Sequence, residues 1–490
     1  MRIAIVGAGF SGIGMAIALR RAGHTDVTVF ERSSDIGGVW NHNTYPGAAC
    51  DVPSYLYSFT ADQRRDWTRP CSPQPEIHDY LRDVAERRGV LSSVRLNTEV
   101  ASADFDEGAL TWTLTTADGE RVQADALVLA CGQLSRPRMP DLPGMGEFAG
   151  PSFHSAEWDH SVELAGKRVA VVGTGASAVQ FVPEIAERAA RVDVYQRTPP
   201  WILPRRNREY APWAQAAIRR IPGMQKLRRA GMLAFMESGI ASQTRVRPLA
   251  LSLRAWSSWH MRRQVKDPAL RRRLRPRYPI GCKRVLFTSH YLPALQRPNV
   301  ELVDAPIERI SEHGVVAAGG HERAIDAIVY GTGFDAHAFV APMAVTGAGG
   351  RTLASAWAGG AEAHLGVSVA GFPNLFLLYG PNTNLGFGSI IVMVEAQMAY
   401  VLDALRRLAA TGATALDVRP EVQRASGEEL QRRLRHSVWT SCRSWYREGG
   451  DGRVVNNWPG QMAENVRRTR HLDPAEYRLL HAQAQEVAPP

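Results

Sequence analysis

The 490-residue sequence has few cysteines, few lysines and no long apolar run. Its five cysteines stand singly at positions 50, 71, 131, 282 and 442, with no CxxC pair and no His/Cys cluster. This pattern favours neither a disulfide framework nor a metal site, and it is typical of a protein from a reducing cytoplasm. No stretch of about 18 apolar residues predicts a membrane-spanning helix, and we expect no membrane partner.

Positive charge is concentrated in one part of the chain. The net charge is +10, yet residues 205–284 hold eighteen arginines and three lysines against three acidic residues. Such a segment could bind nucleic acid or an anionic membrane. We favour a solvated helical insertion at about residues 208–277, because its aromatic residues are not spaced as a stacking platform. No nucleic-acid partner is therefore expected.

The N-terminal residues have the pattern of a dinucleotide-binding unit. An apolar strand signal, RIAIV, leads into GAGFSG, where Gly7, Gly9 and Gly12 fit G-x-G-x-x-G, and an apolar helical pattern follows. These glycines permit a tight turn, close approach to a pyrophosphate and close helix packing. The next strand signal, VTVF, ends at Glu31, whose carboxylate is expected to bind a ribose hydroxyl. This unit suits FAD.

The same pattern recurs after KRVAVV, with one informative difference. Gly173 and Gly175 provide the turn, an alanine takes the third position, and Ser177 stands where the helix begins. The following strand signal ends in Arg197 and Thr198 rather than in an acid. A carboxylate would repel a 2′-phosphate, whereas arginine and threonine can donate hydrogen bonds to it. The second unit therefore suits NADPH.

Two further strand-then-glycine segments, at residues 125–132 and 326–335, are expected to return the chain to a sheet. The predicted fold is α/β, with two Rossmann-like dinucleotide-binding domains and the helical insertion. We expect residues 1–138 and 336–490 to form the FAD domain and residues 139–335 the NADPH domain. Two such domains imply electron flow from NADPH to a flavin.

Two signatures suggest which acceptor takes the electrons. The absence of CxxC argues against a disulfide reductase and leaves dioxygen. The connector FAGPSFHSAEW contains the first signature, FxGxxxHxxxWD, as Phe148, Gly150, His154, Trp158 and Asp159. The second, GGxWxxxxYPGxxxD, runs from Gly37 to Asp51 and includes Gly38 and Trp40.

With GQLSRP, GCKR, GPNTNLGFGS and WTSCRSWY, these signatures resemble the type I Baeyer–Villiger monooxygenases, a class B flavin-dependent family, over nearly the whole chain. The resemblance implies an enzyme that uses FAD, NADPH and O₂ to insert one oxygen beside a ketone carbonyl, through a C4a-peroxyflavin, giving an ester or lactone. The alternatives are a flavin monooxygenase that oxidises sulfur or nitrogen, and an NADPH oxidase or redox-sensing flavoprotein. Sulfur- and nitrogen-oxidising relatives usually lack the final Asp159 of the first signature.

The resemblance also implies roles for individual residues. Arg284 would face the flavin and stabilise the anionic intermediates, with Asp51 as its charge partner. Lys283 would contact the NADPH 2′-phosphate. From its position after the glycine of ACGQLS, Gln133 is a further candidate for a hydrogen bond to cofactor or substrate. Asn384 is expected in a turn or cap at the start of an apolar helix that faces the flavin.

The histidine of the connector has two interpretations. Its unperturbed pKa of about 6.5 would suit a general base. We prefer a latch, in which His154 holds one arrangement of the two domains while aromatic side chains anchor the connector. The aromatic residues of WTSCRSWY are interpreted as substrate-channel or core residues, with neither preferred.

Overall fold

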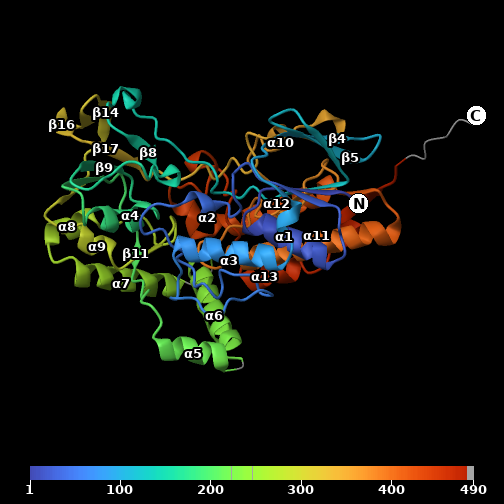
Figure 1. The fold of residues 1–490 in the computed structure, drawn as a ribbon, viewed down its shortest axis with the longest axis horizontal. Helices are drawn as coiled ribbons and strands as arrows, with labels where there is room; N and C mark the ends of the chain where they lie inside the picture. The colour runs from blue at the N-terminus through green and yellow to red at the C-terminus, as the bar shows by residue number, and fades with distance from the viewer. Residues whose placement is uncertain (222, 245–246, 483–490) are drawn as a thin grey trace, which may run out of the picture.

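Two parallel five-stranded sheets form the framework of the computed structural model, which describes residues 1–221, 223–244 and 247–482. The first sheet has the order β19-β7-β1-β2-β3. Its strands are β1 (Ile3–Val6), β2 (Val27–Phe30), β3 (Val94–Arg95), β7 (Ala126–Leu129) and β19 (Leu375–Leu377). Strand β7 is buried along its whole length, as expected for a parallel strand covered on both faces. Helices α1 (Phe10–Arg21) and α11 (Ile390–Thr411) lie side by side in the part of the molecule that contains this sheet (Figure 1).

The second sheet has the order β13-β10-β9-β17-β8 and is also parallel throughout. Its strands are β8 (Ser152–His154), β9 (Arg168–Val172), β10 (Arg191–Tyr195), β13 (Val300–Val303) and β17 (Ala327–Tyr330). Helix α4 (Ala178–Ile185) connects β9 to β10. Figure 1 shows β8, β9 and β17 toward one end of the long axis and α1 and α11 toward the other. The predicted α/β fold with two such units is confirmed.

The predicted helical insertion is confirmed as well. It consists of α5 (Pro212–Arg220), α6 (Met224–Thr244), α7 (Arg247–Gln264) and α8 (Pro268–Arg273). Helices α5 and α6 project from the rest of the molecule, whereas α7 lies beneath the second sheet (Figure 1). No helix in the described part of the chain has the length and apolar character needed to cross a membrane.

The remaining elements surround these two sheets. Three antiparallel strands extend the second unit: β14 (Ile307–Ser311), β15 (Gly314–Ala317) and β16 (His321–Ala324). A four-stranded sheet flanks the first: β4 (Val100–Asp106), β5 (Thr111–Thr116), β6 (Arg121–Ala124) and β18 (Ala344–Thr346). Two short pairs are β11 (Ile202–Leu203) with β12 (Leu286–Phe287) and β20 (Ala415–Val418) with β21 (Tyr477–Leu480). The other helices are α2 (Val39–His42), α3 (Gln74–Arg87), α9 (Tyr291–Ala294), α10 (Leu353–Ala356), α12 (Pro420–Arg435) and α13 (Met462–Arg468).

Candidate functional site

A single large cleft, about 2310 Å³ in volume, brings together most of the residues that the sequence singles out. Its walls come from both parallel-sheet units and from the C-terminal loops. The predicted site residues on its walls are Gly7, Gly9, Glu31, Gly38, Trp40, Asp51, Gln133, Gly173, Gly175, Ser177, Arg197, Thr198, Lys283, Arg284 and Asn384. Two predicted residues, Gly12 and His154, do not line it.

The first glycine turn has the geometry that a bound dinucleotide requires. Gly7 has φ +102°, and a Cβ there would lie 2.6 Å from the carbonyl oxygen of Ala130. Gly12 lies behind the turn, where a Cβ would come within 1.8 Å of the Gly7 oxygen. Gly12 is therefore needed for helix packing, which explains its absence from the cleft wall.

The carboxylate of Glu31 closes this turn from the second strand. One of its oxygens accepts a hydrogen bond from the Ala8 amide at 2.7 Å, and the other accepts one from the Ser33 amide at 3.0 Å. Glu31 is thus fixed on the cleft wall next to the glycine turn. The residues present fit the ribose and pyrophosphate of a dinucleotide.

The second signature adds another wall to the same part of the cleft. Gly38 has φ +55°, and its backbone approaches Gly9 so closely that a Cβ would lie 3.1 Å from the Gly9 Cα. The indole of Trp40 packs edge-on against Tyr57 and donates a hydrogen bond to its hydroxyl at 3.1 Å. Tyr57, which no sequence motif indicated, is a further residue of the cleft wall.

The second glycine turn lines the cleft together with a pair of cations, Arg197 and Lys283. Gly173 has φ +111°, and a Cβ there would lie 2.5 Å from the Gly331 oxygen. Burial and then the positive charge of Arg197 lower the pKa of Lys283. In the described part of the chain, neither cation forms a salt bridge to a carboxylate, so both are available to an anion. This electrostatic arrangement fits a 2′-phosphate beside Thr198.

The guanidinium of Arg284 is fixed by Asp51. Its Nη2 lies 2.7 Å and 2.9 Å from the two carboxylate oxygens of Asp51. The pKa of Arg284 is raised, chiefly by the charge of Asp51. Tyr379 and Tyr446 act electrostatically on the same guanidinium, and burial raises the pKa of Tyr446 to about 12. The structure therefore brings the predicted cation and its predicted partner together on the cleft wall.

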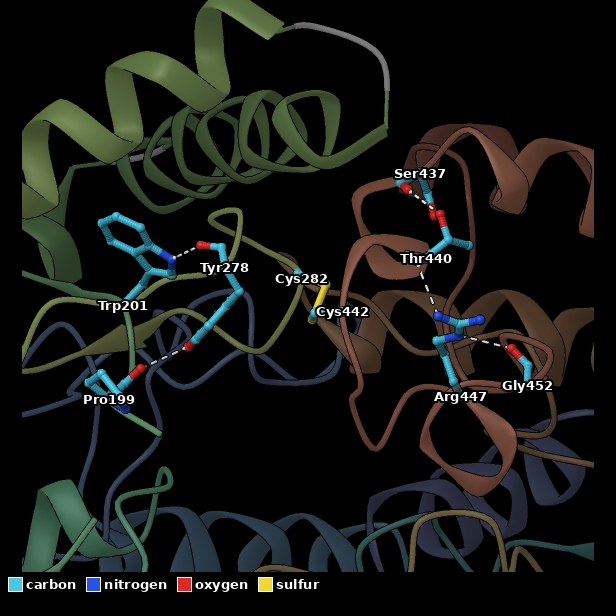
Figure 2. Close-up of a disulfide and its surroundings, with 9 residues drawn as sticks. All are labelled: Pro199, Trp201, Tyr278, Cys282, Ser437, Thr440, Cys442, Arg447 and Gly452. Atoms are coloured by element: carbon cyan, nitrogen blue, oxygen red, sulfur yellow. Dashed lines mark hydrogen bonds between the residues drawn. A yellow bond between two sulfur atoms is a disulfide. The ribbon is translucent and has the colours of Figure 1, made fainter. Parts of the chain in front are cut away.

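The structure corrects the expectation that the cysteines are unpaired. Cys282 and Cys442 form a disulfide that joins the segment of Arg284 to the C-terminal loop (Figure 2). The loop is closed by hydrogen bonds from Arg447 to the carbonyl oxygens of Thr440 at 3.2 Å and Gly452 at 2.9 Å. Both cysteines lie in stretches that resemble the family, but 160 residues separate them, so their spacing gave no sign of pairing. The cysteines therefore no longer indicate a reducing compartment, and the cytoplasmic location stays a prediction.

Of the two roles expected for Asn384, a turn or a helix cap, the structure excludes the cap. Helix α11 begins at Ile390, and its N-cap residue is Ser389. The Asn384 side chain instead accepts a hydrogen bond from the Tyr379 hydroxyl at 2.8 Å and donates one to Asn457 at 2.7 Å. Asn384 still lines the cleft, as part of a polar cluster that ties two loops together.

Gln133 has a similar connecting role. Its amide nitrogen donates to the carbonyl oxygens of Tyr379 and Gly380 at 3.0 Å and 3.1 Å, and its oxygen accepts from Asn456 at 3.1 Å. The side chain is 2% exposed. These contacts show a residue that orders the cleft wall.

The aromatic residues of the C-terminal loop divide between core and cleft. Trp439 and Tyr446 are buried in a small apolar cluster. Trp445 stacks at a tilt on Tyr446, with 4.2 Å between ring centroids, and lines the cleft. Channel and core interpretations thus each apply to part of this loop.

His154 lies in edge strand β8 rather than on the cleft wall. Its Nδ1 accepts a hydrogen bond from the Ala156 amide at 3.1 Å, the side chain is 1% exposed, and burial lowers its pKa. The neighbouring Phe153 and Trp158 pack against the core of the second sheet. This placement fits a residue of the connector better than a general base that meets substrate.

Comparison with known proteins gives a consistent result. Residues 1–243 match the family model described as flavin-binding monooxygenase-like. A Baeyer–Villiger monooxygenase of Pseudomonas aeruginosa is 43% identical over 98% of this chain and 91% of its own, and one of Streptomyces coelicolor is 44% identical over 99% and 94%. Among solved structures, a steroid monooxygenase bound to NADP has a TM-score of 0.88 at 31% identity, over 98% of this chain and 99% of its own. A closed cyclohexanone monooxygenase has a TM-score of 0.89 at 26% identity, over the same shares.

Proposed function

The chain belongs to the Baeyer–Villiger monooxygenase family, and from this premise we propose the reaction in detail and the residues that perform it. The enzyme depends on FAD and NADPH. We propose that it inserts one oxygen atom of O₂ beside the carbonyl of a small-molecule ketone, giving an ester or a lactone. When bound, NADPH would supply a hydride and FAD would activate dioxygen.

The proposed division of the chain follows its two sheets. Residues 1–138 and 336–490 would bind FAD, because they contain every strand of the first sheet and the turn at Gly7. Residues 139–335 would bind NADPH, because they contain every strand of the second sheet and the turn at Gly173.

Binding would depend on the two turns and the unpaired cations. The glycine turn with Glu31 would hold the FAD ribose and pyrophosphate, and Trp40 with Tyr57 would close that wall. Arg197, Thr198 and Lys283 would hold the 2′-phosphate of NADPH, because all three line the cleft and the two neighbouring cations can donate charge-assisted hydrogen bonds to phosphate.

The observation that carries the proposal is the Arg284–Asp51 pair on the cleft wall. Asp51 uses one nitrogen of the guanidinium and so fixes its orientation, while the other N–H groups have no hydrogen-bond partner among the described residues and are available to the cleft. A positive charge held in this way stabilises negative charge that develops on oxygen during carbonyl attack, without reorganisation of solvent. Arg284 is thus the proposed catalytic residue, and Asp51 the residue that positions it.

The test compares Arg284→Ala with the parent enzyme, supplied with ¹⁸O₂, NADPH and a panel of cyclic, linear and aryl ketones. We expect anaerobic flavin reduction to persist and labelled ester to fall by about 100-fold or more, because one stabilising donor is lost. Arg188→Ala, at an exposed position away from the cleft, is the matched control. Ester formation at the parent rate in Arg284→Ala would refute the assignment.

A further inference from the structure

A second cavity, of about 640 Å³, lies in the basic insertion, and the reaction proposed above does not use it. Four arginines line it: Arg254 from α7, Arg272 from α8, and Arg275 and Arg277 from the loop that leads to GCKR. Within the described part of the chain, no acidic residue lines it. Its volume is in the range of ordinary small-molecule sites.

These four guanidiniums are unused by the protein. Within the described residues, none of them forms a salt bridge or donates a side-chain hydrogen bond. Their neighbours on the same helix differ: Arg271 donates to the Val265 oxygen at 3.1 Å, and Arg273 pairs with Asp304 at 2.5 Å. The arginines that turn away from the cavity therefore have partners, whereas those that line it do not.

Asp267, the acid that interacts electrostatically with Arg272, is used to cap α8. Its carboxylate caps α8 by accepting hydrogen bonds from the amides of Ala269 at 2.8 Å and Leu270 at 3.0 Å. Asp267 forms no salt bridge with Arg272 among the described residues, so it does not neutralise that arginine. The charge of Arg272 nevertheless helps to lower the pKa of Asp267. An anion in the cavity would relieve the mutual repulsion of the four cations.

One wall of the cavity is aromatic and well fixed. The Trp201 indole donates a hydrogen bond to the Tyr278 carbonyl at 2.9 Å, and the Tyr278 hydroxyl donates to the Pro199 carbonyl at 3.2 Å (Figure 2). Tyr278 also lines the large cleft, where the ammonium of Lys283 stands 5.1 Å from its ring centroid. The two cavities therefore share a wall, but the cations that would hold the NADPH 2′-phosphate line only the large one.

We propose that this second cavity binds an organic pyrophosphate of the size of a nucleoside diphosphate. The guanidinium fork matches phosphate oxygens in pairs, so four forks suit two adjacent phosphates better than one carboxylate. The aromatic wall provides a surface for an attached ring. The four arginines gather around one cavity, rather than along a stripe that could follow a nucleic-acid strand.

The experiment uses the FAD-loaded enzyme with saturating NADP⁺, so that the large cleft is filled. Binding of ADP, inorganic pyrophosphate and adenosine is measured by calorimetry at low salt. We expect saturable binding of ADP and pyrophosphate, tighter for ADP, and little binding of adenosine. In the double variant Arg275→Gln/Arg277→Gln, ADP affinity should fall by about tenfold or more, because charge-assisted hydrogen bonds are lost.

Arg262→Gln is the matched control, since Arg262 is an exposed arginine of α7 outside the cavity lining. An equal loss of affinity in this control would show that ADP responds to the general positive charge of the insertion rather than to a site in the cavity, and would overturn the proposal. Absence of saturable ADP binding to the parent enzyme with NADP⁺ present would do the same. The KM for NADPH in the double variant should stay unchanged, which keeps this test separate from that of the reaction.

Discussion

Arg284 and Asp51 are 233 residues apart in the sequence, yet their side chains form a two-oxygen contact at 2.7 Å and 2.9 Å on the wall of the large cleft. One residue comes from the segment after the helical insertion and the other from the end of the second signature. The contact therefore ties the two proposed cofactor-binding parts together at the point where the reaction is expected.

Asp51→Asn should test whether Asp51 orients the guanidinium of Arg284. The amide keeps the size of the side chain but removes its negative charge and one acceptor, so the guanidinium of Arg284 is held less firmly. We expect ester formation to fall by about 100-fold, as for a misplaced catalytic group. Rates of flavin reduction and ester release, measured separately by stopped flow and by product analysis, check this. A loss confined to flavin reduction would contradict the positioning role.

Lys283→Gln should change the choice of nicotinamide cofactor. The variant loses a cation that we place at the 2′-phosphate, so the KM for NADPH should rise by about tenfold or more. NADH has no such phosphate, and its KM should change little. Steady-state kinetics with both cofactors provide the measurement, and an equal effect on both would show a structural role instead.

The same residue predicts a pH effect. The pKa of Lys283 is lowered by burial and by Arg197, so the free enzyme loses this proton below the ordinary lysine range. Only the protonated ammonium attracts phosphate, and NADPH affinity should therefore fall as pH rises toward that range. Lys283→Arg, which stays charged, should flatten the alkaline rise in the KM for NADPH. A rise of the same size in that variant would assign the effect to another group.

The Cys282–Cys442 disulfide should stabilise the folded protein and hold the C-terminal loop near Arg284. We expect Cys442→Ser to lower the free energy of unfolding by about 2–4 kcal/mol, as for other long-loop disulfides. Ester formed per NADPH consumed should fall, because the loop that carries Trp445 is no longer tethered. A reductant should lower the Tm of the parent enzyme but not that of Cys282→Ser/Cys442→Ser. Equal sensitivity of both would contradict the prediction.

Local patterns predicted the fold well. Both glycine turns, the strands around them and the helical insertion follow from periodicity and from positions such as Gly7 and Gly173, where a neighbouring carbonyl leaves no space for a Cβ. The resemblance to a family, rather than spacing, predicted the Arg284–Asp51 pair. Neither route predicted the disulfide, because 160 residues separate its cysteines and each lacks a local partner.

Residues that act through tertiary contacts were the most difficult to predict. Tyr57 and Tyr278 shape the cleft through hydrogen bonds of their hydroxyl groups to other segments, and no motif marks them. Asn384 was predicted in a turn or a cap because a helix follows it closely in sequence. The structure uses its amide for Tyr379 and Asn457 instead, since the loop turns before the helix begins.

His154 provides the last prediction, which concerns both stability and turnover. Burial lowers its pKa, so the folded protein resists protonation, whereas the unfolded chain takes up the proton near pH 6.5. Stability should therefore fall as pH drops below that value, by at most about 1.4 kcal/mol per pH unit for one proton. His154→Gln should flatten this part of the stability curve, measured by denaturant unfolding from pH 7 to 5, whereas the exposed His436→Gln should not.

If His154 is the latch of the connector, His154→Ala should also slow NADPH-dependent turnover and leave FAD bound. Loss of flavin from that variant, or unchanged turnover, would assign the residue to the core alone.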